Sequence, residues 1–236
     1  EMSASLVGSE MCIRDRCYEF GRGIEKDSQK ALEYYLKAAN MGYVNAQYCL
    51  GYFYEMHSEI ENSLNESFYW YLKASKQGDS QAMLAIAYYY GHGLGTDKNE
   101  EKAFEFYQKA LQFGEKEAYY HLGICYLEGK GVKQDKGKAI AMLALVEDQY
   151  NLAAYLIGQY FKEMHDDHEA IRHFKIAIQK EDEEQSLYQL ALYGEEGIEI
   201  SEDEMMDYLL RSAKKGYSPA PVSYTHLRAH ETSAHL

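Results

Sequence analysis

The sequence is poor in proline and in long apolar runs. Only 2 of its 236 residues are proline, and 46% are hydrophobic, a composition that favours continuous helix. The apolar run IAMLALV from Ile140 ends before Glu147, and no other run approaches the length of a membrane span. A helix needs roughly 20 apolar residues to cross a bilayer, so we expect no membrane span.

Positive charge is also scarce. The chain has 24 lysines and arginines against 38 aspartates and glutamates, which gives a formal net charge of −14. A field of this sign repels phosphate backbones and anionic lipid. We therefore expect no nucleic-acid partner, and a protein or peptide partner that is neutral or basic.

Motifs for chemistry are missing as well: there is no nucleophile elbow, zinc-protease helix or paired CxxC. The most metal-like string is His165-Asp166-Asp167-His168, followed by His173, but it falls where a polar loop is expected. The glycines from Gly91 to Gly95 lie between two expected helices, whereas a phosphate-binding loop follows a strand. We predict no catalytic residue, no metal and no cofactor.

What the sequence does have is a recurrence of 36 residues. A period of this length is typical of helix-turn-helix units stacked into a solenoid. The columns that repeat include Tyr18, Tyr54, Tyr90 and Tyr126; Gly42, Gly78 and Gly114; and Ala31, Ser67, Ala103 and Ala139.

Two of the columns mark helix ends. Asp27, Ser63, Asn99 and Asp135 are residue types whose side-chain oxygen accepts from the free N–H groups at a helix start. The glycine column is expected to close the same helices, because glycine adopts the left-handed conformation without strain.

The first helix of each repeat carries a stripe of residues that lie four and eight positions after its first member. This spacing puts them on one face, and the small residue permits close helix packing. The stripes are Ala46, Leu50, Gly51 and Tyr54; Ala82, Ile86, Ala87 and Tyr90; and Ala118, Leu122, Gly123 and Tyr126.

The columns together resemble the Sel-one-like repeat, a relative of the tetratricopeptide repeat. The stretches AYYHLGICYLEGKGVKQDKGKA from Ala118 and GRGIEKDSQKALEYYLKAANMG from Gly21 are close to its consensus. The resemblance covers residues 17–220 as a half repeat and about five repeats. It implies an all-α fold, a right-handed superhelical α-solenoid of stacked antiparallel hairpins.

Both ends depart from the repeat. Residues 1–16 and 221–236, which include SASLVGSEMCIRDR and PVSYTHLRAHET, resemble translated sequencing-adapter sequence. We expect both segments to be artefactual, and the natural protein to be longer. Without Cys12, the cysteines Cys17, Cys49 and Cys125 occupy unequal repeat positions, which favours free thiols and a cytoplasmic location over a disulfide framework.

A second row of side chains in the first helices lies roughly 200° from the packing stripe. In tetratricopeptide-like superhelices the first helices line the inner surface, so the resemblance implies that this row follows a concave groove. We predict that the side chains of this row bind a partner. The alternative is that they pack against the first helix of the neighbouring repeat. Some members of the row can bind while others pack. The row comprises Tyr48, Tyr52, Leu84, Tyr88, Tyr120, Ile124, Tyr155, Gln159, Tyr188 and Leu192.

Two classes of function follow. The favoured one is a non-catalytic interaction scaffold that holds a peptide or protein segment on its concave face. The alternative is a small-molecule or cell-wall-fragment binder or hydrolase, like some cysteine-rich relatives, or the structural arm of a larger enzyme. The lack of paired cysteines and of catalytic motifs counts against the alternative.

Overall fold

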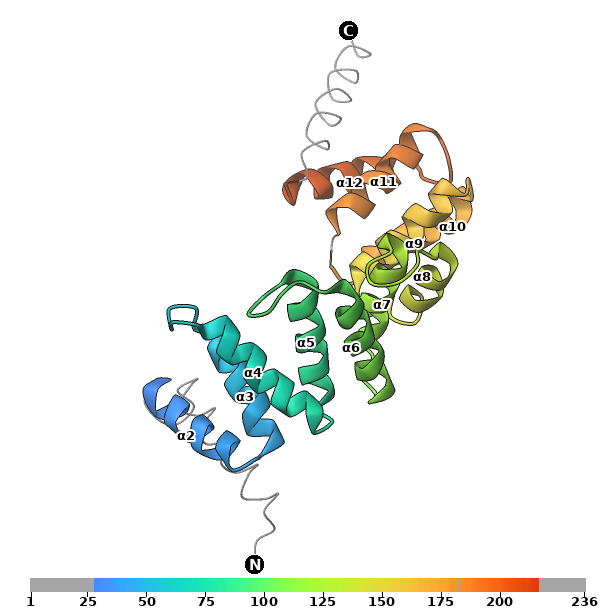
Figure 1. Ribbon diagram of the computed structural model, residues 1–236. Helices are drawn as coiled ribbons and strands as arrows, with labels where there is room; N and C mark the ends of the chain where they lie inside the picture. Colours follow the sequence, from blue (N-terminus) through green and yellow to red (C-terminus); the bar gives the residue numbers. More distant parts are fainter. Residues whose placement is uncertain (1–27, 182, 217–236) are drawn as a thin grey trace, which may run out of the picture. The chain divides into compact units, whose positions relative to one another are not determined.

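The computed structural model describes residues 28–181 and 183–216, and every regular element within them is an α-helix (Figure 1). The predictions for Asp27, Cys17 and the two terminal segments lie outside the described residues. The helices are α2 (Ser28–Asn40), α3 (Val44–Met56), α4 (Ser63–Lys76), α5 (Ser80–His92), α6 (Glu100–Gln112), α7 (Ala118–Glu128), α8 (Lys136–Leu143), α9 (Asn151–Glu163), α10 (Asp167–Ala177), α11 (Glu184–Glu195) and α12 (Glu202–Lys214).

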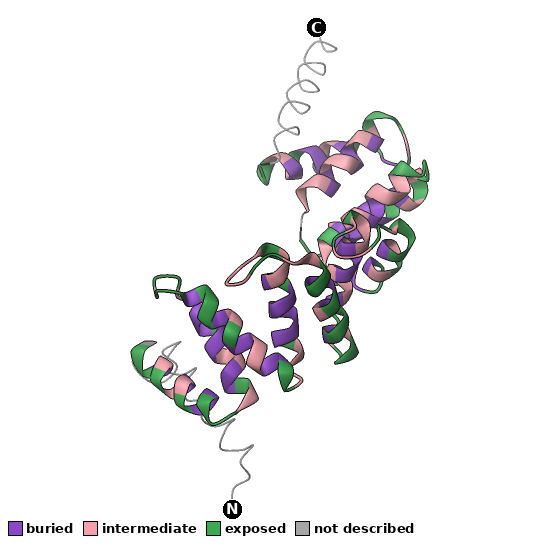
Figure 2. Cartoon of the chain, viewed as in Figure 1, coloured by how far each residue is buried: buried purple, intermediate pink, exposed green. Residues whose placement is uncertain are grey.

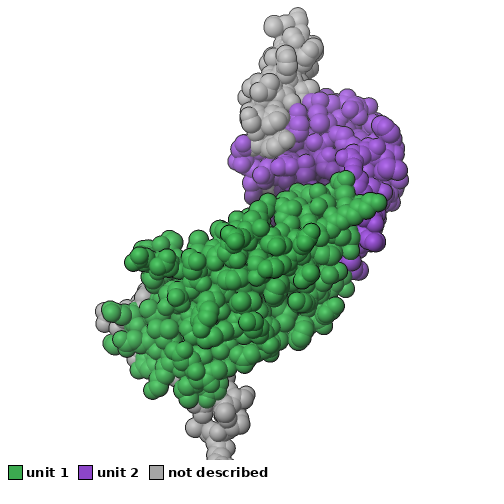
Figure 3. Space-filling model, in the orientation of Figure 1, with its two compact units in different colours: residues 1–134 green, residues 135–236 purple. Residues whose placement is uncertain are grey.

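The chain divides into two compact units, residues 1–134 and 135–236 (Figure 3). The first, unit 1, contains α2 to α7, and the second, unit 2, contains α8 to α12. Within each unit every helix packs against the next one along the chain. Short connections make consecutive helices antiparallel, so each unit is built from helical hairpins.

The predicted packing stripes form the core of these hairpins (Figure 2). Ala46 and Leu50 of α3 are fully buried, as are Ala82 and Ile86 of α5. The small residue has the expected role, because a Cβ on Gly51 would lie 2.7 Å from the ring of Tyr71 in α4. The stripe residues Tyr90 and Tyr126 are only half-buried.

The helix ends follow the prediction at most positions. Gly42, Gly78 and Gly114 have φ of 90°, 92° and 92°, the left-handed region that glycine favours. Asn99 accepts from the Lys102 N–H at 2.9 Å, and Asp135 accepts from the Lys138 N–H at 3.0 Å. Both helix caps are thus confirmed.

The prediction was wrong at Ser63, which is the first residue of α4 and is buried. Asn62 takes the cap position instead, with φ of 58° and no side-chain hydrogen bond to the helix. The connection before it, HSEIEN, lacks the glycines of the other unit 1 loops, so the chain enters α4 through this left-handed asparagine.

In the two glycine-rich loops of unit 1, the second glycine touches the preceding repeat. Gly131, after α7, has φ of +68°, and a Cβ there would overlap the carbonyl oxygen of Glu100 in the first turn of α6. A Cβ on Gly95 would likewise overlap the carbonyl oxygen of Leu64 in α4. We call these two contacts the glycine clamps, because each one fixes a loop against the start of an earlier helix.

Candidate functional site

The predicted row lies on the first helices of the hairpins, and its members differ in burial. Tyr52 and Tyr88 are the exposed tyrosines of the row, at 39% and 42%. Leu84 is 8% exposed and belongs to a core cluster with Tyr107 and Leu122, so it offers little to a partner. The half-buried members are Tyr48, Tyr120, Ile124, Tyr155, Gln159, Tyr188 and Leu192.

On unit 1, we define the tyrosine surface as Tyr48, Tyr52, Tyr88, Tyr120 and Ile124 of α3, α5 and α7. Tyr52, Tyr88 and Ile124 are successive members of one repeat column, 36 residues apart. Two aromatic side chains at equivalent exposed positions present the same kind of contact from neighbouring repeats. The tyrosine surface therefore combines apolar rings with phenol hydroxyls.

A half-buried carboxylate is fixed beside Tyr48. The Tyr71 hydroxyl donates to Glu55 Oε2 at 2.6 Å, and the ring of Tyr71 lies 5.5 Å from that of Tyr48. Burial, and then the hydrogen bond to Glu55, raise the pKa of Tyr71. Burial also raises the pKa of Tyr48, followed by the charges of Asp79 and Glu55. The surroundings of Tyr48 are therefore acidic.

Histidines accompany the tyrosines on α5 and α7. The rings of Tyr88 and His92 have centroids 4.0 Å apart, and His92 Nδ1 lies 2.9 Å from the Tyr88 carbonyl oxygen. His121 stacks on Tyr107 at 4.7 Å with an interplanar angle of 6°. Burial, and then the nearby His92, lower the pKa of His121 to about 4, so this imidazole is neutral at pH 7.

Sequence reasoning missed these histidines and Glu55, because the search for metal-like strings followed short spacings along the chain. A usable signal was present in the distribution of charge. The helices α3, α5 and α7 contain no lysine or arginine, whereas α2, α4 and α6 each contain two lysines. The charged groups that α3 and α7 carry are Glu55 and Glu128.

The lysines of α4 and α6 rest on aromatic rings. Lys73 Nζ lies 4.5 Å from the ring centroids of both Tyr69 and Trp70, and Lys109 Nζ lies 4.6 Å from that of Phe106. Cations over aromatic faces are attracted by the ring quadrupole.

In unit 2, members of the row and their neighbours contact other residues of the chain. Gln159 Nε2 donates to the Tyr155 hydroxyl at 3.1 Å. Lys162 Nζ donates to Gln189 Oε1 at 2.6 Å and lies 5.6 Å from the ring centroid of Tyr193. Tyr155 and Tyr188 also pack against the core cluster of α10, α11 and α12.

The histidine string of unit 2 is engaged in the fold. His173, 7% exposed, places Nδ1 at 2.7 Å from Glu147 Oε2, and His168 Nδ1 lies 3.1 Å from Glu199 Oε1. Asp166 caps α10 by accepting from the Glu169 N–H. Across residues 28–181 and 183–216, no group of three or more histidine, cysteine or acidic side chains is arranged to hold a metal ion.

The described cysteines and helices add two further findings. Cys49 and Cys125 are free thiols, and burial is the main cause that raises the pKa of Cys125 to about 11. Among the helices that the structure describes, none has the length and apolar character needed to cross a membrane.

Comparisons with known proteins identify the repeat. The Sel1 repeat model matches residues 7–43, 44–79, 80–112, 116–145 and 146–182. The first match begins inside the segment 1–16 that we expect to be artefactual, and that expectation stays a prediction. A comparison with curated protein sequences gives no match.

Solved structures of repeat proteins are similar over most of the chain. The crystal structure of c5321, a protective antigen of uropathogenic Escherichia coli with an SLR fold, has a TM-score of 0.82 at 21% identity, and covers 94% of this chain. The chain spans about half of that structure, 49%. A Sel1 repeat protein from Oxalobacter formigenes has a TM-score of 0.75 at 25% identity, with 91% of each chain covered.

These likenesses confirm the predicted all-α solenoid of the tetratricopeptide-like class. Proteins built from Sel1 repeats are commonly protein-interaction scaffolds, and the fold is typically non-catalytic. Since the family model matches well over half of the sequence, the chain belongs to the Sel1 repeat family.

Proposed function

We propose that this chain is a non-catalytic scaffold that binds a protein or peptide segment on the tyrosine surface of unit 1. The observation that carries the proposal is the exposure of Tyr52 and Tyr88 at equivalent positions of neighbouring repeats. Tyrosine is enriched among the residues that contribute most to binding, because it offers a large contact area and a hydroxyl at low entropic cost.

Charge supports a neutral or basic partner. The helices that carry the tyrosine surface contain no lysine or arginine. Glu55 lies in the last turn of α3, and Asp79 caps the start of α5. Complementary charge speeds association and disfavours wrong partners more than it adds raw affinity. We therefore expect the tyrosines to supply affinity and the carboxylates to select for positive charge.

The row positions of unit 2 contribute less in this proposal. Gln159 already donates to Tyr155, and Lys162 already contacts Gln189 and Tyr193. A partner would have to replace these contacts before it gained its own. In this proposal, the unit 2 members of the row form a secondary contact area for the partner. They are Tyr155, Gln159, Tyr188 and Leu192.

The test is a selection of displayed 12-residue peptides against the purified chain, followed by affinity measurement by calorimetry. The double variant Tyr52→Ala/Tyr88→Ala should lose at least about 30-fold in affinity for the selected peptides, since two hot-spot residues contribute about 2 kcal/mol or more.

Tyr69→Ala is the matched control, because Tyr69 is exposed to a similar degree, 47%, on α4. It should leave affinity within about twofold of wild type. Equal loss in the control and the double variant, or unchanged affinity in the double variant with intact helix content by circular dichroism, would refute the proposal.

A further inference from the structure

The carboxylate of Glu55 lies on the same face of α3 as two members of the tyrosine surface. Glu55 follows Tyr48 by seven residues and Tyr52 by three. At about 100° per residue, these spacings keep the three side chains within about 60° of one another around the helix axis. Tyr52 is exposed, whereas Tyr48 and Glu55 are half-buried. A partner that contacts these tyrosines therefore meets the carboxylate.

A buried tyrosine of the next helix fixes the position of Glu55. The hydroxyl of Tyr71 in α4 donates to Glu55 Oε2 at 2.6 Å, and Tyr71 is 1% exposed. Its ring lies against α3 where Gly51 has no side chain, since a Cβ on Gly51 would be 2.7 Å from that ring. The glycine therefore admits the ring, and the ring brings its hydroxyl to Glu55.

Aromatic contacts on two helices hold the Tyr71 ring in place. Its centroid lies 5.5 Å from that of Tyr48 on α3, and 5.8 Å from that of Tyr89 on α5 at an interplanar angle of 79°. The Tyr89 hydroxyl lies 2.7 Å from Ser67 Oγ. Because these contacts restrict Tyr71, the carboxylate that it orients is in position before a partner arrives. Such preorganisation lowers the entropic cost of binding.

The contacts of Glu55 leave its charge uncompensated within the described residues. Over residues 28–181 and 183–216, Glu55 accepts from the Tyr71 hydroxyl and forms no ion pair with a lysine, arginine or histidine. A carboxylate has about four lone-pair sites, so one phenol donor leaves acceptor sites for other donors. Glu55 can therefore pair with a cation that a partner brings.

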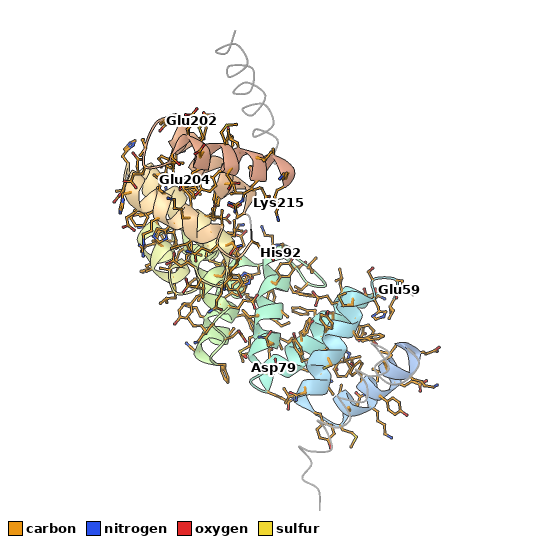
Figure 4. The ribbon with its side chains drawn as sticks, turned by 180° about the vertical axis from the view of Figure 1, so that it is seen from behind. Glu59, Asp79, His92, Glu202, Glu204 and Lys215 are labelled. Atoms are coloured by element: carbon orange, nitrogen blue, oxygen red, sulfur yellow. The ribbon has the colours of Figure 1, made fainter. Side chains whose placement is uncertain are left out.

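Asp79, which precedes α5, is engaged in its own helix. Its side chain accepts from the Ala82 N–H at 2.7 Å and so caps the helix start. Figure 4 shows Asp79 at one end of α5, at the opposite end from His92. Asp79 thus has a structural role that Glu55, in the last turn of α3, does not share.

We propose that Glu55 selects a positively charged side chain in the segment that the scaffold holds, and that Tyr71 is the positioning residue that orients Glu55. The ammonium of a lysine or the guanidinium of an arginine pairs with the carboxylate, while its apolar stem covers the exposed ring of Tyr52. This inference rests on the proposed function and names the residue behind its preference for a basic partner.

The test is a double-mutant cycle between the whole chain and the tightest of its selected peptides. Each lysine of that peptide is replaced by norleucine and each arginine by citrulline, which remove the charge and keep most of the shape. One replacement should weaken binding to wild type at least about fivefold, but binding to Glu55→Gln less than about twofold. The replacement that shows this coupling identifies the cation as lysine or arginine.

Glu105→Gln is the matched control for a lost negative charge. Glu105 is exposed on α6 and follows the control residue Tyr69 by 36 positions. This variant should keep the full preference for the charged peptide. Full preference in Glu55→Gln would overturn the inference.

Tyr71→Phe tests the positioning role, because it retains the buried ring and removes the hydroxyl. The preference for the charged peptide over its neutral version should fall to about two- to threefold. A tyrosine that serves only the core would lower the thermal unfolding temperature without changing this preference. That result would refute the role of Tyr71 in orienting Glu55.

The two proposals fail separately. Suppose that the selected peptides depend on Tyr52 and Tyr88 but have no basic residue, or none whose replacement couples to Glu55→Gln. Selection by Glu55 is then refuted, and the scaffold function stands. If no selected peptide depends on those tyrosines, the scaffold proposal on this surface is refuted, and selection by Glu55 with it.

Discussion

The two units use the same repeat in different ways. In unit 1, the first helices carry exposed tyrosines and no lysine or arginine, and glycine clamps fix the loops after α5 and α7. In unit 2, Lys162 lies on α9 and contacts Gln189, and the buried His173 imidazole places Nδ1 at 2.7 Å from Glu147 Oε2. A single repeat pattern thus leaves tyrosines exposed on the first helices of unit 1, while in unit 2 Lys162 and His173 contact other side chains of the fold.

The largest expected effect tests the glycine clamps of unit 1. Gly131→Ala should destabilise the protein by about 3 to 4 kcal/mol, because the new Cβ overlaps the Glu100 backbone and the left-handed φ is strained. Gly114→Ala is the control, with a similar positive φ but no atom within 4 Å of the added Cβ. It should cost about 1 to 2 kcal/mol in urea unfolding. Equal losses would show that the clamp contributes nothing.

Next in size is the effect of removing the contact between Glu147 and His173 in unit 2. Glu147→Ala leaves the buried His173 imidazole without its 2.7 Å partner and should cost about 2 to 3 kcal/mol. Glu163→Ala, which removes an exposed pair with Lys136, should cost less than about 1 kcal/mol. Thermal unfolding that ranks these two variants in the opposite order would contradict the assignment.

Acidification should destabilise unit 1 through His121. Its pKa in the folded chain, about 4, lies below the ordinary value of 6.5. The folded state therefore resists protonation, so stability is fully present above pH 6.5 and falls as the pH drops toward 4. Relative to His121→Phe, wild type should lose about 2 kcal/mol between pH 7 and pH 4. If the free energies of unfolding of wild type and His121→Phe fall equally between pH 7 and pH 4, protonation of His121 does not cause the loss.

The smallest expected effect is the loss of a helix cap, which we compare at one position in each unit. Asn99→Ala in unit 1 and Asp135→Ala in unit 2 should each cost about 1 kcal/mol, because each removes a side-chain acceptor at a helix start. Asn99→Ser and Asp135→Ser retain such an acceptor and should recover most of the loss. Chemical denaturation curves measure all four variants. A much larger loss at one cap would show that the units depend on their caps unequally.

The sequence predicted the parts of the fold that follow from local chemistry. Helix type, the glycine helix ends and the caps at Asn99 and Asp135 all depend on the residue and its immediate neighbours. Ser63 failed because the loop before it lacks glycine, so the backbone enters α4 through a left-handed Asn62. A column of equivalent residues cannot reveal such a change in loop path.

The candidate site was predictable only in part. Helical spacing placed Leu84 and Tyr88 on the same side of α5, but one is buried and the other exposed, because burial depends on which side chains the next helices bring close. The stacked rings of Tyr107 and His121 join α6 to α7, and periodicity alone did not single out this histidine. Whether the tyrosine surface binds a partner stays a prediction.

The glycine clamps bear on how such a protein changes length during evolution. Each clamp joins a loop to a helix start 31 residues earlier, from Gly95 to Leu64 and from Gly131 to Glu100. Duplication or loss of one complete 36-residue segment in unit 1 would regenerate the same contact at the new junction. Insertions of any other length would misplace the glycine, so the gene can grow or shrink most readily by whole repeats.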